Sequence, residues 1–428
     1  MSRLLIKNGR VVDPSQKLDE GLDILVVEGK IARLAERLAD PNAQVVDATG
    51  LVVAPGFIDV HVHLREPGFE YKETISSGTA AAVAGGFTAV CCMPNTNPVN
   101  DNPAVTEYIL TRAREAGNCR VYPIGAVSKG LAGEELAEMG EMVRAGAVGF
   151  SDDGKPVHSA YLMRRALEYS LLFDVPVVDH CEEPTLTARG VMHEGAVATR
   201  LGLRGIPAAA EEVMVWRDVV LAQLTGARVH IAHLSTAGAL EAVRLAKARG
   251  LKVTCEVTPH HLALTDQAVA ETQYDTNTKM NPPLRSAEHV QALVEGVLDG
   301  TVDCLATDHA PHHADEKNVE FDHAPFGVVG LETAVPVTFD LLVAKHRMPL
   351  SRFVACWSTN PARIFRLPGG SLKVGAPADL TLLDPEQRAT VKPEKFRSKS
   401  RNTPFAGRRL RGWPAMTIVG GRVVFRRG

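Results

Sequence analysis

Apolar and polar residues alternate in short runs at both ends of the chain. These runs are 4–12, 22–27, 45–53, 378–383 and 416–424. Alternation with a period of two is typical of strands that bury one face. Because the middle of the chain shows a different pattern, we expect one small β domain that is built from residues 1–55 together with residues 367–428.

Between the two ends, an apolar strand, a turn and a segment with helical periodicity follow one another repeatedly. The expected strands are 57–63, 88–93, 120–126, 147–153, 175–180, 228–234, 252–258 and 302–309. The expected helices include 137–145, 160–172, 211–224, 237–248, 287–298 and 333–345. Eight consecutive strand–helix units are the signature of a (β/α)8 TIM barrel. We therefore predict an α/β protein with a TIM barrel over residues 56–366 and a small β-sandwich domain formed by both termini.

The composition excludes several classes of function. Of the 428 residues, 45% are apolar and 23% charged, as in ordinary soluble proteins. A formal net charge of -3 gives no electrostatic case for a nucleic-acid or membrane partner. The seven cysteines are scattered and lie mostly in apolar runs, which is typical of buried thiols in a reducing compartment. No stretch resembles a signal peptide or a membrane span, so we expect a cytoplasmic protein that acts on a small molecule.

The first expected barrel strand carries a His-x-His pair. His61 and His63 are two residues apart, so both side chains point to the same side of a strand that runs into a Pro/Gly turn. Neutral imidazole is a preferred ligand of zinc, and the pair can supply half of a metal site. A short match of this kind also occurs by chance, so the later strands decide its meaning.

Four later strands also end in side chains of the metal-ligand type. These are Asp152 and Asp153 in the fourth strand, His180 in the fifth, His233 in the sixth and Asp308 in the eighth. Singly, such an aspartate is equally well explained as a helix N-cap, and such a histidine as a bonded core residue. Together they favour a shared site, because barrels gather reactive groups at the C-terminal ends of their strands. Four histidines and two carboxylates can hold two divalent ions when one carboxylate bridges them.

Several motifs make the chain similar to a known family over nearly its whole length. They are 61–68, 93–96, 151–154, 281–285, 306–312 and 402–405. By these motifs the chain resembles the dihydroorotases of the type I bacterial class, within the amidohydrolase superfamily. The resemblance implies a reversible, zinc-dependent cyclisation of N-carbamoyl-L-aspartate to L-dihydroorotate, a step of pyrimidine biosynthesis.

The resemblance also implies a ligand set for two zinc ions. It assigns His61, His63 and Asp308 to one ion, His180 and His233 to the other, and Asp153 to the bridge. Hydantoinases, dihydropyrimidinases and allantoinases resemble this fold but bridge their metals with a carboxylated lysine at the end of the fourth strand. Here Lys155 is the nearby lysine, and we interpret it as a surface or lid residue. The choice of Asp153 over Asp152 rests on the family pattern alone.

The substrate carries an α-carboxylate, which a planar fork of donors binds well. Arg65 lies two residues past His63, and Asn95 follows the second strand; the resemblance supplies the other contacts. The expected substrate-binding residues are His63, Arg65, Asn95, Asn281, His312, Phe326 and Gly327. The alternatives are an ion pair of Arg65 with Glu66 and turn-forming roles for the two asparagines.

Asp308 is the expected catalytic residue. As well as binding metal, it takes a proton from the attacking hydroxide and delivers it to the departing ring nitrogen. The charged loop 310–327 follows the same strand and is either a lid over the substrate or a solvated connection.

Two other functions stay open at this stage. One is a hydantoinase-like cyclic amide hydrolase, and the other is a non-catalytic dihydroorotase-like partner of aspartate transcarbamoylase. The resemblance is also compatible with an active enzyme that associates with aspartate transcarbamoylase, and we expect a homo-oligomer. The sequence leaves the number of bound metal ions and the size of the oligomer undecided.

Overall fold

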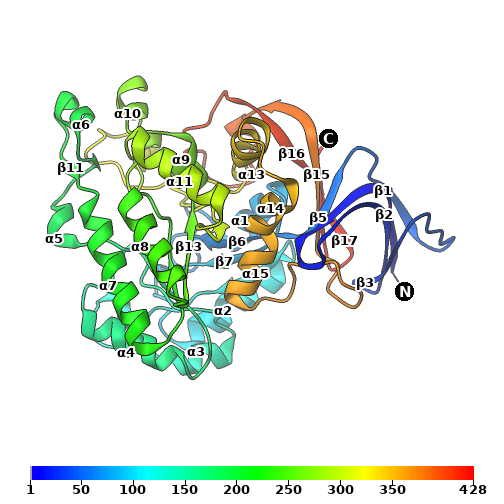
Figure 1. The fold of residues 1–428 in the computed structure, drawn as a ribbon, viewed down its shortest axis with the longest axis horizontal. Coiled ribbons are helices and arrows are strands. Elements are labelled where there is room, and N and C mark those ends of the chain that lie inside the picture. The colour runs from blue at the N-terminus through cyan, green and yellow to red at the C-terminus, as the bar shows by residue number, and fades with distance from the viewer. Residues whose placement is uncertain (1) are drawn as a thin grey trace.

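The computed structural model describes residues 2–428 (Figure 1). The first residue of the predicted small domain, Met1, lies outside the described residues. The chain forms a barrel surrounded by helices, and a β domain at one side of it contains strands from both chain ends. This arrangement confirms the predicted TIM barrel with a small β-sandwich domain.

Eight strands form the sheet of the small domain. They are β1 (Arg3–Asp13), β2 (Leu18–Val27), β3 (Lys30–Ala35), β4 (Gln44–Asp47), β5 (Val52–Pro55), β15 (Leu380–Thr390), β16 (Arg409–Val419) and β17 (Arg422–Arg426). Antiparallel pairing of β5 with β15 joins the N-terminal strands to the C-terminal ones. Ile24 and Ile418 belong to one apolar core, so the two ends of the chain stabilise each other. The alternation missed β3, because Ile31 is its one buried residue.

Strands in parallel pairing make the barrel wall. They are β6 (Phe57–Val62), β7 (Phe87–Cys92), β8 (Arg120–Pro123), β9 (Val177–Asp179), β12 (Val229–Ile231), β13 (Val253–Val257) and β14 (Cys304–Leu305). A bridge between Val62 and His309 links the first position of the barrel to the last. All these strands therefore point their C-terminal ends toward the same mouth.

The fourth position of the barrel differs from the prediction. A full strand over 147–153 was expected, but Phe150 alone pairs there, with Gly125 on one side and Val177 on the other. Beyond it the chain turns out of the sheet, because the carboxylate of Asp152 binds backbone N–H groups of a neighbouring loop. The prediction of a continuous strand was wrong, although its place in the barrel was right.

The described residues form fifteen α-helices, and the longest of them cover the outer face of the barrel (Figure 1). They are α1 (Ile75–Ala84), α2 (Pro103–Ala116), α3 (Met139–Ala145), α4 (Ala160–Ser170), α5 (Pro184–Thr187), α6 (Ala196–Leu201), α7 (Ala209–Thr225), α8 (Ala237–Ala248), α9 (Pro259–Ala263), α10 (Gln267–Glu271), α11 (Ala287–Asp299), α12 (Ala314–Lys317), α13 (Ala334–Thr338), α14 (Leu350–Val354) and α15 (Asn360–Phe365). A short ribbon of β10 (Met192–His193) and β11 (Gly205–Ile206) lies before α7. The predicted helix 333–345 begins as α13 and continues as a π-helical segment, Phe339–Lys345.

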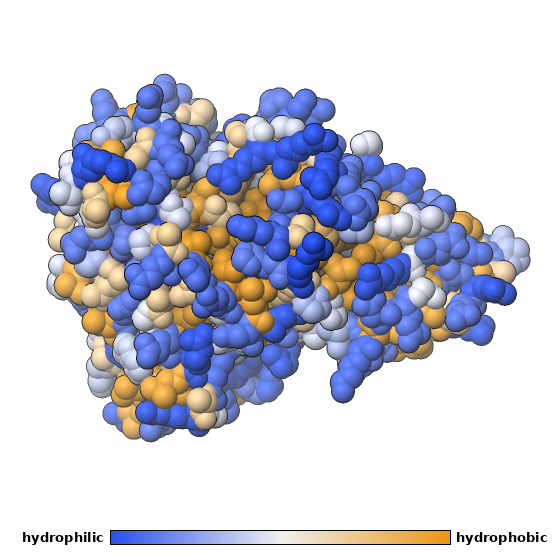
Figure 2. Space-filling model, turned by 45° about the horizontal axis from the view of Figure 1, so that its top comes forward, coloured by the Kyte–Doolittle hydropathy of each residue, from blue (hydrophilic) through white to orange (hydrophobic). Residues whose placement is uncertain are grey.

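Hydrophilic side chains cover much of the visible face of both domains (Figure 2). The seven cysteines are buried with free thiols, as their apolar surroundings in the sequence predict. Within residues 2–428, no helix combines the length and the apolar character that crossing a membrane requires.

Candidate metal centre and substrate cavity

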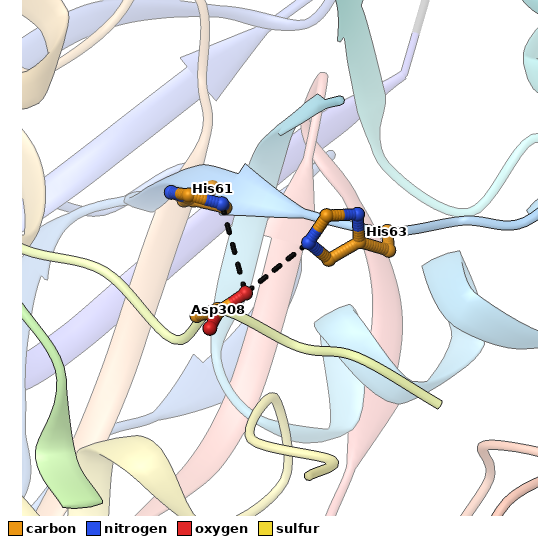
Figure 3. Close-up of side chains that lie close together, drawn as sticks. All are labelled: His61, His63 and Asp308. Atoms are coloured by element: carbon orange, nitrogen blue, oxygen red, sulfur yellow. Dashed lines mark hydrogen bonds and ion pairs between the residues drawn. The ribbon is translucent and has the colours of Figure 1, made fainter. Parts of the chain in front are cut away.

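Two histidines of the first barrel strand face an aspartate of the last one (Figure 3). His61 lies in β6, His63 follows it directly, and Asp308 follows β14. Oδ1 of Asp308 is 3.6 Å from Nε2 of His61 and 3.2 Å from Nε2 of His63. Because the three side chains are buried and aim at one point, they form a candidate metal site.

Asp153 lies between this group and a second pair of histidines. Its Oδ2 is 3.3 Å from Nε2 of His63, and its Oδ1 is 3.3 Å from Nε2 of His61. The same Oδ1 is 3.5 Å from Nε2 of His233 and 3.7 Å from Nδ1 of His180. One carboxylate therefore faces four histidines, which is the position that a bridging ligand needs.

The neighbouring Asp152 does not face the histidines and instead accepts hydrogen bonds from a loop. Its Oδ1 accepts hydrogen bonds from the backbone N–H groups of Val127 and Ser128, at 2.8 and 3.0 Å. Its second oxygen accepts from the Ser128 hydroxyl. The carboxylate of Asp152 is thus committed to the preceding loop, whereas Lys155 is exposed to solvent.

The donor set fits a cation. Nε2 of His61 and Oδ1 of Asp153 are buried, face each other and have no hydrogen-bond partner among the described residues. An unsatisfied buried polar group costs about 1–3 kcal/mol, which an ion between the two atoms would offset. Burial opposes a charge on His61, but Asp153 and Glu256 outweigh it and raise its pKa well above the usual value. The pocket therefore favours a positive charge at this point, as a divalent ion would supply.

Glu256, which lies in β13, contacts His61 and His233 on the side away from the candidate metal position. Its Oε1 accepts a hydrogen bond from Nδ1 of His61 at 2.7 Å and one from the backbone N–H of His233 at 3.3 Å. A carboxylate bonded to Nδ1 fixes the ring so that Nε2 points at the metal position. The sequence analysis missed this residue, although a lone acid inside an apolar barrel strand was a usable signal.

His180 has a comparable partner. Its Nε2 is 2.8 Å from Oε2 of Glu182, while its Nδ1 lies 2.9 Å from Nε2 of His233. The side-chain amide of Asn281 also donates to Oε2 of Glu182. The predicted substrate residue Asn281 therefore also helps to orient His180. Glu182 was missed as well, although it lies two residues past a predicted ligand.

A cavity of about 360 Å3 opens in front of these ligands. The predicted substrate residues all line it, namely His63, Arg65, Asn95, Asn281, His312, Phe326 and Gly327. Nδ1 of His63 donates to Oδ1 of Asn95 at 2.9 Å, which leaves the amide protons of Asn95 for another acceptor. The volume suits a small molecule.

Three side chains of this site leave backbones with positive φ. The φ angles are 62° for Arg65, 30° for His233 and 47° for Asp308. Residues other than glycine adopt this region at a cost of about 1–3 kcal/mol, and such strain concentrates at functional sites. The strained backbone directs these three side chains into the mouth of the barrel.

Arg65 does not form the alternative ion pair with its neighbour. Glu66 pairs with Nε of Arg112 at 2.7 Å, and Nε of Arg65 donates to the carbonyl oxygen of Pro311 at 3.2 Å. The hydrogen bond at Nε therefore holds the guanidinium group in place. Its two terminal nitrogens are the groups available to an anion in the cavity.

Two buried lysines fasten the loop 310–327. Nζ of Lys279 donates to the carbonyl oxygens of Phe321 and Asp322, at 2.8 and 3.0 Å. Nζ of Lys317 donates to Thr276 and Pro325, at 3.0 and 2.8 Å. The loop is thus an anchored wall of the cavity and not a freely solvated connection.

A histidine and aspartate centre at the mouth of a barrel has the architecture of a metal-binding hydrolase, and the solved structures that this chain resembles place it among the hydrolases of cyclic amides. The L-hydantoinase from Arthrobacter aurescens matches with a TM-score of 0.87 at 28% identity, over 100% of this chain and 97% of its own. The D-hydantoinase from a Thermus species matches with a TM-score of 0.82 at 26% identity, over 99% and 96%.

The sequence comparisons give the family. A Dihydro-orotase-like family model matches residues 50–239. The dihydroorotase of Syntrophotalea carbinolica is 54% identical over 424 residues, which are 99% of each chain. That of Anaeromyxobacter dehalogenans is 57% identical over 426 residues, or 99% of this chain and 98% of its own. The chain therefore belongs to the dihydroorotase family.

Proposed function

We propose that this enzyme is a dihydroorotase of the type I bacterial class, which interconverts N-carbamoyl-L-aspartate and L-dihydroorotate in pyrimidine biosynthesis. The observation that carries the proposal is the position of Asp153, whose carboxylate faces all four histidines. Hydantoinases use a carboxylated lysine at this place. Here the nearby Lys155 is exposed, so an aspartate occupies the bridging position.

The cofactor we propose is zinc, with up to two ions per subunit. By the family resemblance, His61, His63 and Asp308 would hold one ion, His180 and His233 would hold the other, and Asp153 would be shared between them. When bound, zinc would polarise the amide carbonyl of the substrate and would make the attacking water more acidic.

Asp308 moves the proton in the proposed reaction. Burial raises the pKa of this carboxyl, but His63 and His61 outweigh burial and hold it well below its usual value. The carboxylate is therefore ionised at neutral pH and can accept a proton. In ring opening it passes the proton from the attacking water to the departing ring nitrogen. In cyclisation it receives the proton that the carbamoyl nitrogen loses.

In this proposal, the part of the cavity wall that lies beside His63 binds the α-carboxylate. Arg65 supplies two guanidinium N–H groups, and Asn95 supplies its amide. His312 donates from Nε2 to the carbonyl of Phe326 at 2.8 Å, which fixes the wall near Gly327. Binding this carboxylate orients the ring with its amide toward the metal ligands.

The proposed function is tested with two rings that differ in the carboxylate. We expect the zinc-loaded protein to open L-dihydroorotate with a kcat/KM about 10⁴-fold above that for 5,6-dihydrouracil, because the latter leaves Arg65 unpaired. Ultraviolet absorbance follows both reactions. Comparable rates would favour a hydantoinase-like enzyme, and zinc-loaded protein that opens neither ring, alone or with aspartate transcarbamoylase, would favour a non-catalytic role.

Replacing Glu256 with glutamine should weaken zinc binding. The variant keeps the shape of the side chain but loses the charge behind His61, and changes of this kind cost about 10–100-fold in metal affinity. Competition with a chromophoric chelator measures the affinity. Glu241, which is exposed on α8, provides the matched Glu241→Gln control. An unchanged affinity in Glu256→Gln would show that this residue does not support the ligands.

Partners and organisation complete the proposal. The family resemblance supports a homo-oligomer and an association with aspartate transcarbamoylase, and the buried free thiols favour a cytoplasmic location. We also propose the division into a barrel over 56–366 and a small domain of 1–55 plus 367–428. The end of β5 at Pro55 and of α15 at Phe365 supports these boundaries.

A further inference from the structure

Residues 397–402 leave the small domain between β15 and β16 and lie against two loops at the mouth of the barrel. We name this segment the strap. The backbone N–H groups of Arg397 and Ser398 donate to Oε1 of Glu332, at 2.7 and 3.2 Å. The backbone N–H of Lys399 donates to Oε1 of Glu73 at 3.1 Å. Charged side chains of the barrel therefore fix the course of the strap.

Asn402 ends the strap and is buried. Its Nδ2 donates to the carbonyl oxygens of Ala310 and Gly327, at 3.2 and 3.1 Å. Its Oδ1 accepts from the backbone N–H of His312 at 3.3 Å, and its own carbonyl accepts from Val329 at 2.9 Å. Only a side-chain amide can donate twice and accept once at these positions. Asn402 thereby joins both ends of the loop 310–327.

The peptide that Asn402 holds also holds Arg65. Pro311 lies between Ala310 and His312, the two residues bonded to the Asn402 side chain, and its carbonyl accepts from Nε of Arg65. Arg65 lies at a backbone position with positive φ, a strained conformation that persists only where surrounding contacts hold the residue in place. A shift of the Pro311 carbonyl would turn the guanidinium away from the cavity.

We propose that Asn402 is a positioning residue for the substrate carboxylate, acting through Pro311 on Arg65. Among the residues described, those that line the 360 Å3 cavity do not include Asn402, so its influence is indirect. This inference rests on the proposed function, in which Arg65 binds the α-carboxylate. It gives a role to the motif 402–405, which the sequence marks as specific to the family, and it makes the strap part of the active site.

The test is a double-mutant cycle with Asn402→Ala and Arg65→Met. We expect Asn402→Ala to raise the KM for L-dihydroorotate about tenfold and to change kcat little, because the metal ligands stay in place. Arg65→Met should raise KM further. The KM of the double variant should equal that of Arg65→Met alone, since both changes remove the same contact with the substrate carboxylate. Independent effects that multiply in the double variant, or an unchanged KM in Asn402→Ala, would overturn the proposal.

Two further variants separate positioning from a loss of folding. Asn402→Asp keeps the size of the side chain and its acceptor but loses both donated bonds, so KM should rise as in Asn402→Ala. Asn360 donates to the carbonyl of Asp303 at 2.7 Å, near the start of β14 and away from the mouth. Asn360→Ala removes a comparable bond, and it should leave KM unchanged and show no coupling to Arg65→Met.

Calorimetric binding of L-dihydroorotate to the same zinc-loaded variants distinguishes this inference from the proposed function. If the wild type binds the ring without opening it, the proposed activity fails, while the coupling can still be read in Kd. If the ring is opened but Kd and KM show no coupling, only the role of Asn402 fails. A wild type that neither binds nor opens the ring overturns both.

Discussion

Replacing Asp308 with asparagine lowers the rate of L-dihydroorotate opening by about 10³-fold or more and leaves most of the metal bound. The amide keeps an oxygen toward His61 and His63, but it cannot accept the proton of the attacking water, and general acid–base groups contribute about 10²–10⁴-fold. Steady-state kinetics gives the rate, and atomic absorption gives the zinc content of the same sample.

The control for this substitution lies in the loop that follows. Asp315 is exposed, with 90% of its side chain accessible, so Asp315→Asn should retain the wild-type rate. A near wild-type rate in Asp308→Asn would assign the proton transfer to another group. Loss of zinc together with the rate would show that Asp308 acts mainly as a ligand.

Stripping the metal with a chelator abolishes activity, and added zinc restores it. Without an ion, the buried carboxylates of Asp153 and Asp308 still face His61 and His63, but no divalent charge polarises the amide carbonyl or makes the attacking water more acidic. The measurement is the rate after dialysis against chelator and after addition of zinc in steps. Chelator saturated with zinc beforehand should have no effect, and full activity in metal-free protein would refute the metal-dependent mechanism.

The fold could be predicted from the sequence because the hydrophobic pattern of the terminal strands differs clearly from that of the strand and helix units between them. Period-two alternation marked the terminal strands, and repeated strand and helix units marked the barrel. The pattern failed where pairing depends on the neighbours, as at Phe150, which forms two isolated bridges while Val148 and Ser151 keep only single backbone hydrogen bonds to the preceding position of the barrel. It also failed at β3, which buries too little to show a pattern.

The site could be predicted in part, since barrel strands place their final residues at one mouth. The structure brings all the predicted ligands and substrate residues together there, while their roles stay predictions. Strand ends did not mark Glu256 or Asn402, because Glu256 lies inside its strand and Asn402 outside the barrel, and their roles depend on contacts that join residues 195 and 92 positions apart. The choice between Asp152 and Asp153 likewise depended on where Val127 and Ser128 lie.

The pairing of β5 with β15 has a consequence for synthesis on the ribosome. β5 ends at Pro55, and its partner β15 begins at Leu380, so the whole barrel is translated before that edge is covered. An uncovered strand edge is a template for pairing with another chain, and contacts this distant in sequence form slowly. The nascent chain therefore exposes this edge of its first sheet until β15 emerges, and that interval is when it most needs protection from aggregation.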